Sequence, residues 1–140
     1  MRISSIAIGL AVTIGPAFLM PLLVTTAQAV QDQPAMIGGV ETVCTGVGSA
    51  KDNPAWSAYP VKLVFANPAG QNLAQVHVAV LQGAKAVVET HCDAPWVLMK
   101  LPAGSYSVAA TVGARVGKAS FSTKGGAQQE ITVMLPPSGQ

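Results

Sequence analysis

Short apolar segments with a period of two residues dominate the chain after Tyr59, and this period favours strands over helices. In segment 76–80 valines occupy every second position, and His77 and Ala79 lie between them. The same pattern recurs at 61–65, 88–92, 106–112 and 131–135. Turn residues separate about seven such strands, which is typical of an antiparallel β-sandwich. We therefore expect an all-β fold.

The N-terminal segment has the composition of an export signal. Arg2 precedes an almost wholly apolar run over 6–24, and Ala27 and Ala29 form a small-residue cleavage site. We expect cleavage after Ala29 to remove residues 1–29 as a signal peptide. The alternative is an uncleaved membrane anchor, because the run approaches the roughly 20 residues that span a bilayer. Two prolines within the run disfavour a long, uninterrupted helix.

After cleavage the chain has the length of one ordinary domain. We expect a flexible leader over 30–37, a β-sandwich domain over 38–136 and a short tail over 137–140. The whole sequence has eight Lys and Arg against six Asp and Glu, with no run of either sign. This balance excludes electrostatic recruitment to nucleic acid or anionic lipid. We expect a periplasmic or secreted protein that does not insert into the membrane once cleaved.

Two cysteines, Cys44 and Cys92, remain in the mature chain. An even number of cysteines in an oxidising compartment favours a disulfide. Closing a loop of about 50 residues would contribute roughly 4 kcal/mol in the chain-entropy treatment. The alternative is two buried free thiols. A C-x-x-C spacing is absent, so neither thiol redox chemistry nor a cysteine zinc site has local support.

The segment 101–110, LPAGSYSVAA, resembles the L-P-x-G-x-Y-x-V-x-A pattern of carboxypeptidase regulatory-like domains. These are transthyretin-like (prealbumin-like) sandwiches with an Ig-like architecture. Segment 74–80 is similar to the V-x-V strand of that family, and the resemblance extends over roughly 38–135. It implies a binding appendage without catalytic activity, since in larger proteins this domain accompanies a separate catalytic or transport module. The general pattern does not require the two cysteines.

The turn in this pattern has a physical basis in four residues: Leu101, Pro102, Gly104 and Tyr106. Proline at the second turn position already has the required φ, and glycine suits the fourth position. The tyrosine that follows can pack its ring inward while its hydroxyl reaches the backbone at the end of the sandwich.

Catalysis by a nucleophile and a base would need Ser or Cys beside His, with a carboxylate to orient the base. The chain has only His77 and His91, which the strand alternation places on polar faces. The hydroxyisourate hydrolase of the transthyretin-like fold ends in Tyr-Arg-Gly-Ser, whereas segment 136–140 is PPSGQ. We therefore expect neither an enzyme nor a bound cofactor.

A weak metal site is a further hypothesis. His77 and His91 could bind copper or zinc if a hairpin places them side by side, with Glu89 as a nearby donor. A third and a fourth ligand are not evident from the sequence. The alternative is that both are ordinary exposed histidines.

Aromatic residues at loop ends are the remaining candidates for binding. Trp56 and Tyr59 either form a binding surface for a peptide, glycan or protein or cover an open end of the core. Trp96 is expected to pack. Our leading hypothesis is a non-catalytic module that binds a protein, peptide or envelope component through loops or a sheet edge. The alternative is weak copper or zinc binding by His77 and His91.

Overall fold

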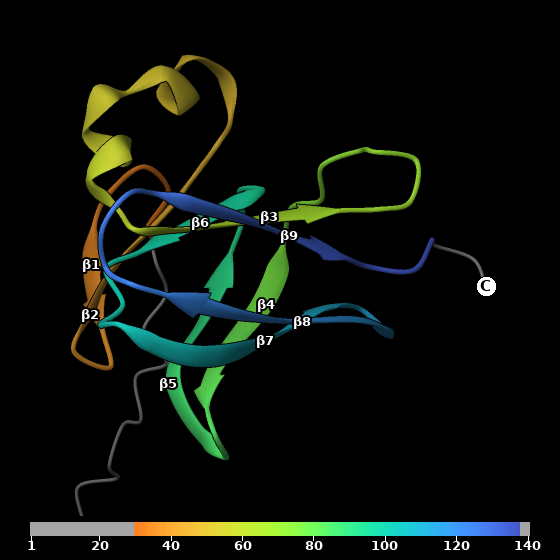
Figure 1. Cartoon of the computed structure of the whole chain (residues 1–140). Coiled ribbons are helices and arrows are strands. Elements are labelled where there is room, and N and C mark those ends of the chain that lie inside the picture. The colour runs from red at the N-terminus through yellow and green to blue at the C-terminus, as the bar shows by residue number, and fades with distance from the viewer. Residues whose placement is uncertain (1–29, 138–140) are drawn as a thin grey trace, which may run out of the picture.

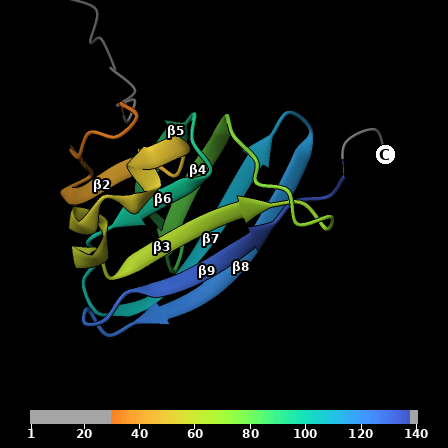
Figure 2. The same ribbon diagram turned by 90° about the horizontal axis from the view of Figure 1, so that it is seen from above.

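The computed structural model describes residues 30–137, which form two facing β-sheets (Figures 1 and 2). In sheet A the strands lie in the order β1 (Ala35–Ile37), β2 (Val40–Thr45), β6 (Trp96–Met99), β3 (Val61–Ala66) and β9 (Gln129–Met134). In sheet B the order is β5 (Lys85–Cys92), β4 (Val76–Gln82), β7 (Gly104–Val112) and β8 (Arg115–Thr123). The expected all-β sandwich is confirmed.

The core lies between the two sheets. Successive side chains of a strand point to opposite faces of its sheet, and in these strands the apolar ones point to the inner face. In β4 the side chains of Val76, Val78 and Val80 are fully buried, while His77 is exposed. The other members of the inner faces include Val61, Leu63, Phe65, Val88, Val97, Met99, Val108, Ala110, Phe121 and Val133. The period-two segments of the sequence therefore correspond to the strands that build the core.

One pair of neighbours in sheet A is parallel. β9 lies beside β3, with Val61 opposite Gln129 and Ala66 opposite Met134, whereas the other paired strands are antiparallel. This pairing makes β9 an edge of sheet A and brings it close to β8, the edge of sheet B. At that corner a Cβ on Gly117 would collide with the carbonyl of Met134. Glycine is therefore what permits the close approach of the two edges.

The expected disulfide is confirmed. Cys44 in β2 and Cys92 in β5 are bonded, their Cα atoms are 5.7 Å apart, and both residues are fully buried. Because β2 belongs to sheet A and β5 to sheet B, the bond joins the two sheets through the core.

Segment 30–37, which the sequence predicts to be a flexible leader, instead includes a short strand. Its residues 35–37 form β1, which pairs with β2 and buries Ile37 in the core. The Asp32 amide donates to the carbonyl of Cys44 at 2.7 Å, and its carboxylate accepts from Thr45 Oγ1 at 2.8 Å. The outer edge of β2 offers backbone groups that need partners, and this segment supplies them. The proposed signal peptide and most of the tail lie outside the described residues.

The all-apolar segment around β6 is covered on both faces. Val97 and Met99 face the main core, whereas Leu98 belongs to a second cluster on the outer face of sheet A. This explains why the sequence of β6 shows no alternation. The helices found among residues 30–137 all lack the length and apolar character that a bilayer-spanning helix requires.

The chain bends at Ala103 before it enters β7 at Gly104, and Tyr106 lies as its sequence predicts. Leu101 and Tyr106 are buried, and the Tyr106 hydroxyl donates to the Pro102 carbonyl at 2.7 Å. The Tyr106 ring stacks on Phe121 of the neighbouring strand β8, with ring centroids 5.7 Å apart. The hydroxyl bond thus fixes the turn to the end of the sandwich.

Candidate functional site

The connection between β2 and β3 folds over the outer face of sheet A and forms two short 3-10 helices, η1 (Gly48–Asp52) and η2 (Pro54–Ala58). Asn53 is the N-cap of η2: its side chain accepts a hydrogen bond from Ala55 N at 2.9 Å, and Pro54 follows it at the first helical position. Trp56 then points toward the sheet, and its indole N–H donates to the Ala50 carbonyl at 2.7 Å. These bonds hold the connection in place over sheet A.

The two aromatic residues predicted as a possible binding surface are largely buried in this second cluster. Trp56 and Tyr59 are 7% and 3% exposed, and they pack on Val43 and Leu98. Their rings meet edge to face with centroids 6.1 Å apart. Tyr59 therefore covers the sheet, whereas part of Trp56 still lines a cleft described below.

A polar network borders Tyr59. Lys100 Nζ lies 2.8 Å from Glu41 Oε2 and 5.1 Å from the centre of the Tyr59 ring. The hydrogen bond from Lys100, reinforced by one from the Tyr59 hydroxyl, lowers the pKa of Glu41 below its usual value. Burial, followed by the hydrogen bond to Glu41 and the negative charge of that carboxylate, raises the pKa of Tyr59 to about 12. Tyr59 is thus fixed by its ring and by its hydroxyl.

Lys62 and Trp96 form a close pair on the same face of sheet A. The Lys62 ammonium lies 3.6 Å from the centre of the Trp96 ring and 3.7 Å from Glu130 Oε2. The Lys62 side chain is only 16% exposed, so much of its surface is removed from water. A Cβ added to Gly46, whose φ is +110°, would lie 2.7 Å from the Trp96 ring. The backbone of Gly46 therefore packs directly on the indole.

These residues border a cleft of about 180 Å³, which we name the Trp–Lys cleft. Its lining consists of Lys51, Asp52, Asn53, Trp56, Ser57, Lys62, Trp96, Leu98 and Gln128. The indole rings supply apolar walls, and ammonium, amide and carboxylate groups surround them. Gln128 Nε2 donates to the Trp56 carbonyl at 2.8 Å, which fixes one rim of the cleft. The cleft has room for one small side chain or functional group of a partner.

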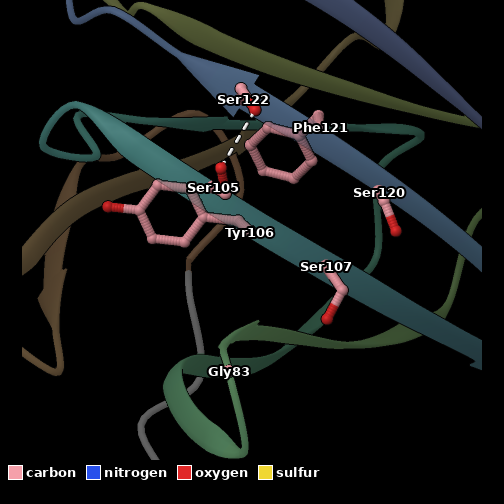
Figure 3. A pocket seen from close by; sticks show the side chains of 7 residues that line it. All are labelled: Gly83, Ser105, Tyr106, Ser107, Ser120, Phe121 and Ser122. Carbon is pink, nitrogen blue, oxygen red and sulfur yellow. Dashed lines mark hydrogen bonds between the residues drawn. The ribbon is translucent and has the colours of Figure 1, made fainter.

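A larger, shallower depression lies on the outer face of sheet B. It has a volume of about 610 Å³ and is lined by Gly83, Ser105, Tyr106, Ser107, Ser120, Phe121 and Ser122 (Figure 3). The hydroxyls of Ser105 and Ser122 lie 3.2 Å apart. None of the lining residues is a histidine or a carboxylate, so the serines there lack the base that a nucleophile needs.

The two histidines are direct neighbours across the β4–β5 hairpin. His77 is the Cα partner of His91. His77 Nε2 lies 3.1 Å from Glu89 Oε1, and His91 Nε2 lies 3.1 Å from Asp93 Oδ1. In the part of the chain that the structure describes, no group of three or more His, Cys, Asp or Glu residues is arranged to hold a metal ion.

Sequence reasoning missed the pairing of Lys62 with Trp96, although it singled out Trp96 as a packing residue. The pairing depends on the register of β3 against β6, in which Lys62 lies opposite Leu98 and Val64 opposite Trp96. One signal was present in the sequence, because Lys62 is the single charged residue in the apolar strand 61–66. A charge in such a strand needs a partner when its side chain is largely removed from water, as that of Lys62 is.

Comparison of the sequence with known protein families finds no family that matches it, and comparison with curated proteins finds no match. The geometry described above is therefore the basis on which function is inferred.

Proposed function

We propose that the mature chain is a non-catalytic binding module of the periplasm or the extracellular space, of the carboxypeptidase regulatory-like type. The signal-like segment 1–29 supports export, and a buried disulfide is the kind of bond that persists in an oxidising compartment. The LPAGSY turn and the sandwich architecture agree with the family resemblance. Its partner would be a protein, a peptide or a component of the cell envelope.

The Trp–Lys cleft is the observation that carries this proposal. Lys62 is held over Trp96 at the border of the cleft, and an apolar wall with a few polar groups around it is typical of binding sites. Tryptophan is also enriched among the residues that dominate binding energy at interfaces. We infer that a segment of the partner lies across η2 and β6 and inserts one side chain or end group into the cleft.

The experiment combines capture of a partner with NMR signals from the two tryptophan side chains. The chain has two tryptophans, and both line the cleft. The exported form of the chain is used as bait in an envelope extract, beside a Lys62→Gln variant and a Lys124→Gln variant. Lys124 is an exposed loop residue outside the cleft, so the second variant controls for the loss of one charge.

We expect wild type and Lys124→Gln to retain the same component and Lys62→Gln to retain at least about tenfold less. Adding that component to nitrogen-labelled protein should shift both indole N–H signals in the NMR spectrum. Retention that is equal for all three proteins, or that leaves both indole signals unmoved, would place binding elsewhere and reject the cleft.

A second candidate function is weak binding of copper or zinc by His77 and His91. The observation in its favour is that they are Cα partners on adjacent strands, each with a carboxylate nearby. Two imidazoles across a strand pair supply two of the ligands that these metals prefer. Calorimetric titration with each metal tests this function: replacing both histidines with alanine should abolish the heat of binding, and an unchanged titration rejects it.

A further inference from the structure

The two outer faces of the sandwich differ in how they are covered. Helices η1 and η2 lie over sheet A, on the side away from sheet B (Figures 1 and 2). The inner face of sheet B packs on sheet A through the core, and the edges of the two sheets come close where β8 approaches β9 and where β5 approaches β1 and β2. Within residues 30–137, no element of secondary structure packs over the outer face of β4 and β7.

The strand register arranges this outer face in rows. One row runs from Glu89 on β5 through Ala79 on β4 and Ala109 on β7 to Lys118 on β8. We name it the central row. Glu89 and Lys118 are exposed, and the two alanines between them are partly exposed. The row therefore has an acidic end, a basic end and a centre of two methyl groups.

This order of charges makes the row complementary to itself. Consider two copies packed with these faces together. A two-fold axis that lies between the two faces, parallel to the strands and above the space between β4 and β7, places Ala79 of one copy over Ala109 of the other. The same axis places Glu89 of each copy over Lys118 of the other, which gives two opposite-charge pairs. Small central residues permit two sheet faces to approach to the roughly 10 Å of ordinary sheet packing.

The adjacent row adds complementarity of shape. It consists of Leu81 on β4, Ser107 on β7 and Ser120 on β8. The small side chains of β7 and β8 leave a hollow of about 390 Å³. Ala109, Ser120 and Leu81 are among the residues that line it. The hollow adjoins the serine-lined depression of Figure 3, since both include Ser107 and Ser120. The two-fold axis places Leu81 of one copy over Ser107 of the other, where the hollow receives it.

We propose that the outer face of sheet B binds the same face of a second copy of this chain. Strands of nine residues are about 30 Å long and four strands span about 19 Å, so the face has a projected area of about 600 Å². Standard stable interfaces bury about 800 Å² on each partner. The dimer is therefore weak and reversible, and it leaves the Trp–Lys cleft of both copies open, because the cleft lies on sheet A.

The experiment is sedimentation velocity over a concentration series of the exported form of the chain. Wild type should change from monomer to dimer as the concentration rises. The single variants Lys118→Glu and Glu89→Lys each replace two attractive contacts with two repulsive ones, so each should raise the dissociation constant at least about tenfold. The double variant carries the exchanged charges on both copies, and its dissociation constant should return to within about threefold of wild type.

The Lys124→Glu variant is the matched control, because it makes the same change of charge on a loop outside the face. Circular dichroism of each variant checks that the sandwich remains folded. The proposal is overturned by a chain that stays monomeric at every concentration, by a dimer that both single variants leave unchanged, or by a double variant as weak as the single variants. A monomer that instead binds a different protein through sheet B also overturns it.

Discussion

Cys44 and Cys92 lie opposite one another across the core, and their disulfide joins an inner strand of sheet A to an edge strand of sheet B. β5 also contributes Val88 to the shared core and lies close to β1 and β2. The bond therefore fastens the side of the sandwich that lies away from the β8–β9 corner.

Removing this disulfide should lower the stability of the fold substantially. The bond spans 48 residues of sequence, and its loss in a Cys44→Ala, Cys92→Ala double variant should lower the free energy of unfolding by about 4 kcal/mol. Urea denaturation of wild type and variant measures the difference. A reductant should bring wild type toward the variant and leave the variant unchanged. A difference below about 1 kcal/mol would contradict this role.

The contact between Lys62 and Trp96 should contribute measurably to stability. A double-mutant cycle with Lys62→Met and Trp96→Leu removes the ammonium and the indole separately and together. We expect a coupling of about 1–2 kcal/mol, between the values for exposed and for desolvated cation–aromatic pairs, because Trp96 is half-buried and Lys62 is only 16% exposed. Denaturant unfolding of the four proteins gives the coupling. A value indistinguishable from zero would mean that the ammonium lies over the ring without stabilising the fold.

Tyr59 should make the fold sensitive to alkaline pH. Its pKa is raised from the ordinary 10.0 to about 12, so the folded state retains a proton that the unfolded state loses first. The stabilisation is complete below pH 10 and is lost as pH rises toward 12. Thermal unfolding across this window, compared with Tyr59→Phe, should show a steeper loss of stability in wild type. Equal slopes for the two proteins would show that Tyr59 ionises normally.

Replacing Glu41 tests the cause of that shift. The Glu41→Gln variant removes the carboxylate charge beside the Tyr59 hydroxyl, so the pKa of Tyr59 should fall toward its ordinary value without reaching it, because burial remains the larger cause. Ultraviolet absorbance of tyrosinate as a function of pH follows the titration. An unchanged titration would remove Glu41 from the explanation.

Gly46 should tolerate no side chain. Its positive φ disfavours other residues, and a Cβ there would collide with the Trp96 ring. We expect Gly46→Ala to destabilise the fold by about 2–3 kcal/mol. Gly48→Ala is the matched control, because that position also has a positive φ but nothing lies within 4 Å of its added Cβ. Equal losses for both variants would show that the indole moves aside without cost.

The sequence predicted the fold far better than the site. Alternation located strands such as β4 and β7, because each of these has one buried face and one more exposed face. It could not assign the faces of β6, since the β2–β3 connection covers the second face. It also missed β1, because a three-residue edge strand has no period of its own.

The Trp–Lys cleft could not be derived from the sequence because its parts come from distant segments. Strands β3 and β6 and the segment just before β9 bring Lys62, Trp96 and Gln128 together. The order of those strands in sheet A is not evident from alternation. The histidine pair shows the opposite case. A hairpin joins β4 to β5, so sequence alone foresaw that His77 and His91 could be neighbours.

The parallel pairing of β3 with β9 has a consequence for the order in which the chain folds. Among residues 30–137, β9 is the last strand to be synthesised, yet it pairs with β3, which is made much earlier. Loop closure over most of the domain must precede this pairing, which makes folding slow and late. Cys44 and Cys92 both emerge before β9, so oxidation can link the half-built sheets first. The disulfide would then shorten the search that the final strand must make.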